Sequence, residues 1–165
     1  MTSNSQNVQD ELSRRYRKAS MVVAAFLALD VVLVAIAFFA SNSIYRPGDP
    51  SIIMALWIAI LVFGLGAFVI RRTKFAAMRL KDIAAVKGIP ALLKTLQDTT
   101  IQVASIGGAI ALMGFIITIM TSEDGKSADW TNMLRAGGVA AIVLIYCYPF
   151  RGAWQRVVTQ LGRED

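Results

Sequence analysis

The sequence predicts an all-α protein with four transmembrane helices, and three observations indicate this fold class. Of the 165 residues, 56% are hydrophobic and only 17% are charged, whereas an ordinary soluble domain has about 25% charged residues. The apolar residues gather in four runs, each close to the length of about 20 residues that crosses a bilayer. The lysines and arginines lie mainly between these runs and at the two ends of the chain.

The four runs differ in how cleanly they exclude charge. They are Ala19 to Ala40, Pro50 to Ile70, Thr99 to Ser122 and Ala136 to Phe150. The second and third contain no charged residue, and the first contains only Asp30. The fourth is short, so a full span has to begin near Trp130 and include Arg135.

The basic residues predict the orientation of the spans. Fourteen of the 17 lysines and arginines precede the first run, separate the second from the third, or follow the fourth. The other side carries only Arg46, Lys126 and Arg135. Because positive residues stay cytoplasmic, both termini are expected on the cytoplasmic side of the cell (inner) membrane. The net charge of +6 therefore reflects this bias, and we expect no nucleic-acid partner.

The chain is accordingly divided into five segments. They are a polar basic cytoplasmic segment (1–18), a transmembrane hairpin (19–71), a basic cytoplasmic helical elbow (72–98), a second hairpin (99–150) and a cytoplasmic tail (151–165). The first residues, Met1 to Glu11, are polar and lack periodicity, so we expect no regular structure there.

Several residues predict where helices begin and end. Asp49 is suited to cap the second span, with Pro50 at its first helical position, and Asp129 is suited to cap the fourth. In the elbow, Lys87-Gly88-Ile89-Pro90 predicts that one helix stops and another starts. Two arrangements of the elbow are open. Either the second and third spans extend into the cytoplasm as a packed helical pair, which we favour, or the stretch before this break lies flat on the membrane.

Basic residues of the elbow are candidates for contact with lipid head groups or a partner, because they end a span at the cytoplasmic surface. They are Arg71, Arg72, Lys74, Arg79 and Lys81.

A shift of 80 residues aligns the two hairpins in outline. Asp49 then corresponds to Asp129 and Arg71 to Arg151, but few other positions are identical. This agrees either with a parallel duplication or with the general likeness of any two membrane hairpins.

Asp30 is the strongest candidate for a functional residue. It lies ten residues before Ala40, about 15 Å below the end of the span and near the bilayer midplane. A charged Asp at this depth costs about 2.5–3.5 kcal/mol on insertion scales, so a partner is expected. Arg135, Ser105, Thr118 and Tyr146 are the candidates. The carboxyl group serves either as a packing contact, which we favour, or as a proton or cation site.

Small residues at a spacing of three to four form a second signal in the third and fourth spans. They are Gly107, Gly108, Ala111, Gly137 and Ala141. Such residues let helices approach closely, either within the chain or against another subunit.

The composition excludes most familiar active-site chemistry. With no His and one Cys, the chain cannot form His/Cys zinc sites, disulfides or Ser-His catalysis. The acidic pair Glu123 and Asp124 is typical of a solvated loop. We therefore expect no enzyme, no catalytic residue, no metal and no cofactor.

The sequence favours a non-enzymatic membrane protein that acts by association. It would be an accessory or structural subunit of a membrane complex, or a homo-oligomer. The alternative is a small oligomeric channel or transporter with Asp30 as its proton or cation site.

Overall fold

A computed structural model shows an all-α chain. It describes the backbone of residues 2–122, 125, 127–152 and 154–155, and the side chains of these residues except 2–7, 77 and 79. The helices are α1 (Thr2–Phe39), α2 (Ser41–Ile44), α3 (Pro50–Lys74), α4 (Ala77–Met120) and α5 (Trp130–Cys147). Four of them, all but α2, are long and apolar enough to cross a membrane.

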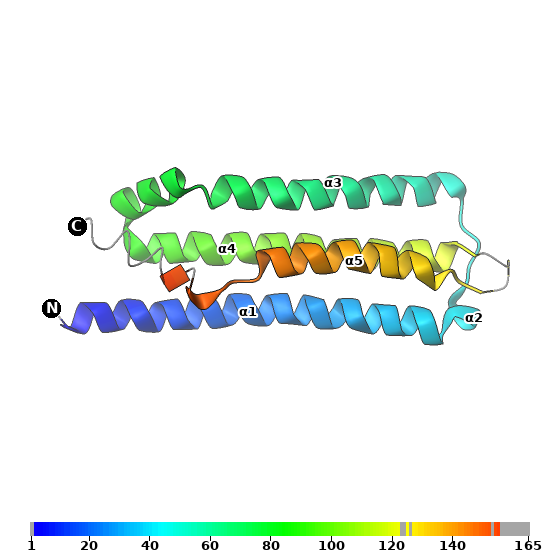
Figure 1. The fold of residues 1–165 in the computed structure, drawn as a ribbon, viewed down its shortest axis with the longest axis horizontal. Helices are drawn as coiled ribbons and strands as arrows, with labels where there is room; N and C mark the ends of the chain where they lie inside the picture. The colour runs from blue at the N-terminus through cyan, green and yellow to red at the C-terminus, as the bar shows by residue number, and fades with distance from the viewer. Residues whose placement is uncertain (1, 123–124, 126, 153, 156–165) are drawn as a thin grey trace.

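The long helices run side by side, and each is antiparallel to the next along the chain (Figure 1). Helix α4 packs against α1, α3 and α5, whereas α1 and α3 lie on opposite sides of the α4–α5 pair (Figure 1). The two helices predicted as the first hairpin are thus not packed on each other. Small residues of α4 account for this, because they let α1 and α5 approach the same helix closely.

The two ends of the bundle differ in composition. We call the end that holds residues 8–18, 71–98, 150–152 and 154–155 the basic end, and the end that holds residues 40–49, 119–122, 125 and 127–129 the loop end (Figure 1). At the loop end, the two loops hydrogen-bond to one another. The Arg46 amide donates to the Ile119 carbonyl (2.9 Å), and the Ala128 amide donates to that of Ser41 (3.0 Å).

The predicted helix starts are confirmed. The Asp49 carboxylate accepts the Ser51 amide (2.8 Å) at the start of α3, with Pro50 at its first position. The Asp129 carboxylate accepts the Thr131 amide (3.0 Å) at the start of α5. Each cap satisfies an amide that has no partner within its own helix.

The elbow contains the predicted break. Gly88 has φ 77° and ψ 172°, which interrupts α4 two residues before Pro90. Glycine adopts this positive φ without the clash that a Cβ would cause. The second span does not continue into the elbow as one helix, however. Helix α3 ends at Lys74, and the extended backbone of Ala76 separates it from α4.

The polar start of the chain is helical, which contradicts the expected lack of structure. Helix α1 begins at Thr2. At the basic end, Leu12 is fully buried and Val8 packs against the same apolar cluster as Leu92 and Leu96 of α4. Burial of these side chains stabilises the helix, although their sequence neighbours are polar.

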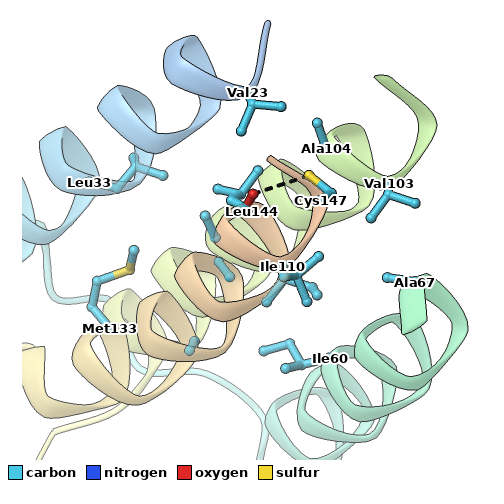
Figure 2. Close-up of a cluster of buried hydrophobic side chains, with 14 of the residues drawn as sticks. Val23, Leu33, Ile60, Ala67, Val103, Ala104, Ile110, Met133, Leu144 and Cys147 are labelled. Atoms are coloured by element: carbon cyan, nitrogen blue, oxygen red, sulfur yellow. Dashed lines mark hydrogen bonds between the residues drawn. The ribbon is translucent and has the colours of Figure 1, made fainter. Parts of the chain in front are cut away.

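Two apolar clusters hold the helices together. The larger lies along the spans, and side chains from α1, α3, α4 and α5 meet in it (Figure 2). The smaller lies at the basic end, and its buried members are Leu12, Ala19, Leu80, Leu92, Leu93, Leu96 and Trp154. Many large apolar side chains outside both clusters face outward, as expected of helices surrounded by lipid.

Candidate functional site

Asp30 belongs to α1, and its buried side chain packs against α5 next to the larger cluster. Its side chain is 5% exposed. Its Oδ1 atom is covered and has no hydrogen-bond partner among the described residues. Buried polar atoms nearly always have a partner, so this oxygen is exceptional.

Gly137 of α5 provides the space for this carboxyl group. A Cβ atom at Gly137 would lie 3.0 Å from Asp30 Oδ1, tighter than an ordinary contact. The same Cβ would lie 3.4 Å from Val34 and 3.6 Å from Met133, so the surroundings are apolar. An unpaired carboxylate in such surroundings is costly, which makes Asp30 the most unusual group of the described chain.

The structure does not bring the expected partners to Asp30. Arg135 is exposed on α5. Ser105 is also exposed, and its hydroxyl donates to the Ile101 carbonyl of its own helix (3.0 Å). Thr118 is buried, but it donates to the Gly114 carbonyl (2.9 Å). Ser and Thr hydroxyls in helices commonly donate to a carbonyl one turn earlier in the same helix. For this reason their positions in the sequence did not identify a partner for Asp30.

Tyr146, the remaining candidate, lies beside Arg71. The guanidinium carbon of Arg71 is 4.1 Å from the Tyr146 ring centroid, and the Phe68 ring stacks on Tyr146 at 5.3 Å. The Phe75 ring also lies near Arg71, with its centroid 5.6 Å from the guanidinium carbon. Sequence analysis missed this group. The spacing of Phe68, Arg71 and Phe75 places them on one face of α3 and could have revealed it.

Most of the predicted small residues pack inside the chain. A Cβ at Gly107 would lie 2.8 Å from Leu144, and one at Gly108 would overlap the Phe26 ring. Ala111 is buried, and Ala141 is half-buried. Gly107, Gly108, Ala111 and Gly137 are therefore packing contacts between helices of this chain, so they are not available as an oligomer face. Gly114, which sequence analysis did not single out, packs as closely against Ala136.

The predicted basic contacts surround the end of α3. Arg71 is half-buried, Lys74 is half-exposed, and Arg72 and Lys81 are exposed. The side chain of Arg79 and the pair at 123–124 lie outside the described residues. Arg71 thus differs from its basic neighbours, because part of its charge is held against aromatic rings.

No metal or thiol chemistry emerges from the described residues. Among them, no three His, Cys, Asp or Glu side chains lie close enough to hold a metal ion. Cys147 is buried, and its Sγ atom donates to the Leu144 carbonyl (3.2 Å; Figure 2). A buried thiol among apolar neighbours is chemically inert.

No family model matches the chain, and no curated protein or solved structure is significantly similar to it. A proposal about function therefore rests on the geometry of Asp30, on the Arg71 group and on the surface of the helices.

Proposed function

We propose that the chain is a multi-pass membrane protein that acts by association, either as an accessory subunit of a membrane complex or as a homo-oligomer. Its basic end, with both termini, lies on the cytoplasmic side of an inner membrane. The distribution of basic residues supports this orientation, since fourteen of 17 belong to the segments at or beyond that end.

The observation that carries the proposal is that the other helices of the chain cover little of α3. Only Ile60 and Ala67 of its 25 residues are buried. Many of its large apolar side chains are exposed, among them Ile58, Leu61 and Leu65, and Gly66 has no neighbouring atom within 4 Å of the position of a Cβ. Gly138 on α5 is uncovered in the same way. Uncovered glycines on apolar helices allow the backbone of another helix to approach closely.

Association is tested on the purified chain by native mass spectrometry in a mild detergent. The wild type is expected as a stable assembly. Gly66→Leu and Gly138→Leu add bulk to uncovered surface and should dissociate it without lowering the melting temperature of the single chain. A wild-type chain that is monomeric, and that captures no membrane subunit when purified from its own membrane, contradicts the proposal.

Orientation is tested by thiol labelling of single-cysteine variants in a Cys147→Ala background. Ser43 at the loop end and Lys87 at the basic end are both exposed. Ser43→Cys should react with an impermeant reagent in intact cells, and Lys87→Cys only after permeabilisation. The opposite pattern contradicts the proposed orientation and leaves the test of association intact.

The second candidate is a proton or cation pathway through Asp30. The unpartnered Oδ1 atom favours it, because carboxyl groups within membranes commonly mark such pathways. In proteoliposomes, Asp30→Asn should then abolish flux while the assembly stays intact. An Asp30→Asn variant that loses its assembly, or a wild type without flux, instead supports a packing role.

A further inference from the structure

Arg71 is held by aromatic rings from two helices. Its guanidinium carbon lies over the rings of Tyr146 on α5 and of Phe75 at the C-terminal cap of α3, at 4.1 and 5.6 Å. The Phe68 ring stacks on Tyr146, with ring centroids 5.3 Å apart and an interplanar angle of 24°. Stacking on an aromatic face orients the guanidinium plane and leaves its N–H groups at the edge.

Arg71 has no anionic partner among the described residues. Its Nη1 atom is covered and has no hydrogen-bond partner there. No ion pair joins Arg71 to a described carboxylate. A half-buried cation needs a counter-charge, because the aromatic rings remove water without supplying an anion.

The depth of Arg71 indicates where that anion comes from. The 21 residues from Pro50 to Ile70 carry no charge and span about 31 Å of helix. This matches the hydrocarbon core of a bilayer, about 30 Å thick, so Arg71 lies at the boundary with the head groups. Arg72 and Lys74 follow directly and make the potential at this boundary more positive.

We propose that Arg71 binds the phosphate group of an anionic phospholipid at the basic end of the bundle. Because Nη1 is covered, the phosphate oxygens accept from the other N–H groups of the guanidinium, while Tyr146 and Phe75 hold its plane. The site rests on the proposed insertion of the chain in a membrane, and it does not depend on association. The group that the site binds is a negatively charged phosphate, which in a phospholipid is a phosphodiester.

The test compares lipids on the purified full-length chain. Native mass spectrometry measures retention of phosphatidylglycerol and of phosphatidylcholine with the same acyl chains, and thermal unfolding measures their stabilising effect. The wild type should retain the anionic lipid preferentially. Arg71→Gln should lower that affinity about tenfold, since it removes a charge-assisted pair. Arg135→Gln, an exposed arginine near the loop end, is the matched control and should leave it unchanged.

Two further variants test the aromatic support. Tyr146→Phe keeps the ring and should keep the lipid preference, whereas Tyr146→Leu removes the ring and should weaken it. Equal retention of both lipids by the wild type, or an unchanged preference in Arg71→Gln, overturns the proposal. The wild-type comparison decides it even if a variant fails to fold.

Inorganic phosphate separates the two sources of the anion. Stabilisation by free phosphate at concentrations where phosphatidylglycerol has no effect overturns the lipid assignment. Failure of the proposed membrane insertion is recognised separately, because the chain would then be extracted from membranes by alkaline carbonate. A monomeric chain that still prefers the anionic lipid contradicts association alone.

Discussion

Helices α3 and α5 pack on the same central helix, but they do so to different extents. Helix α5 buries Asn132, Met133 and six further residues among its 18, whereas α3 buries two among 25. Their hydropathy has the opposite order, because α3 is clearly more apolar than α5. The more apolar helix is therefore the less covered one.

This difference follows from what surrounds each helix. A helix covered by its neighbours keeps polar groups such as Asn132 because they find partners there, in this case Thr121 (3.1 Å) and Asp129 (3.0 Å). A helix that the rest of its chain leaves uncovered has no such partners, so its exposed surface is apolar. High hydropathy thus marks helix surface that the chain does not cover itself, and the tightly packed small residues mark contacts between its own helices.

The largest expected effect breaks the contact between α4 and α5. Gly114→Leu forces a side chain into Ala136, where a Cβ atom would already overlap. Overpacking of this kind should lower the free energy of unfolding by about 3 kcal/mol. The matched change on α3, Gly64→Leu, meets only Val139 at an ordinary distance of 3.7 Å and should cost far less. Thermal unfolding in detergent measures both, and equal losses would show that the two contacts are equally tight.

A smaller effect is expected from shortening the side chains of α3. Ile60 is 3% exposed and Ile58 is 55% exposed. Ile60→Ala should lower the free energy of unfolding by about 2 kcal/mol, because it leaves a cavity in the larger cluster. Ile58→Ala should change it by less than about 0.5 kcal/mol. A large loss for Ile58→Ala in the dissociated chain would mean that α3 is covered on another side.

Adjacent glycines on α5 give a smaller contrast. Gly138→Ala should stabilise the helix by up to about 1 kcal/mol, because alanine favours helix and nothing lies within 4 Å. Gly137→Ala has the same helical gain but places a methyl group 3.0 Å from Asp30 Oδ1. We expect its stability to fall below that of Gly138→Ala by about 1 kcal/mol. Equal stabilities would indicate that α1 moves away freely at Asp30.

The smallest expected effect concerns the cap of α3. The Ser51 hydroxyl and amide donate to the Asp49 carboxylate and lower its pKa below the usual value. The folded chain therefore favours the ionised form, and this contribution to stability is complete above the usual carboxyl pKa. It is lost as the pH falls through the lowered pKa. Melting temperatures measured across this acidic range should fall less steeply for Asp49→Asn than for the wild type, and identical profiles would contradict this role of the cap.

The sequence predicted those features that depend on nearby residues. The start of the second span, its cap at Asp49 and the break at Gly88 follow from hydropathy and from the chemistry of single residues, and the structure agrees. The lateral order of the helices depends on contacts between distant segments. For that reason the separation of α1 from α3, the packing of Gly114 and the pairing of Arg71 with Tyr146 were not predicted.

Asp30 illustrates both sides of this limit. Hydropathy identified the residue, because one charge interrupts an otherwise apolar run. Its surroundings depend on the rotation of α1 against α5, and four candidate partners with suitable chemistry all lie elsewhere. Gly137 is the residue that makes room for Asp30 on α5, because a Cβ atom there would lie 3.0 Å from the Asp30 Oδ1 atom.

The smaller cluster at the basic end has a consequence for the order of biosynthesis. Leu12 lies near the start of the chain, while Trp154 comes almost at its end, and its ring meets that of Tyr16 at 6.2 Å. During translation, Leu12 leaves the ribosome long before Trp154 is added to the chain. The apolar face of Leu12 and Ala19 therefore remains incomplete until Trp154 has been made, and premature termination before residue 154 leaves it open to chaperones and proteases.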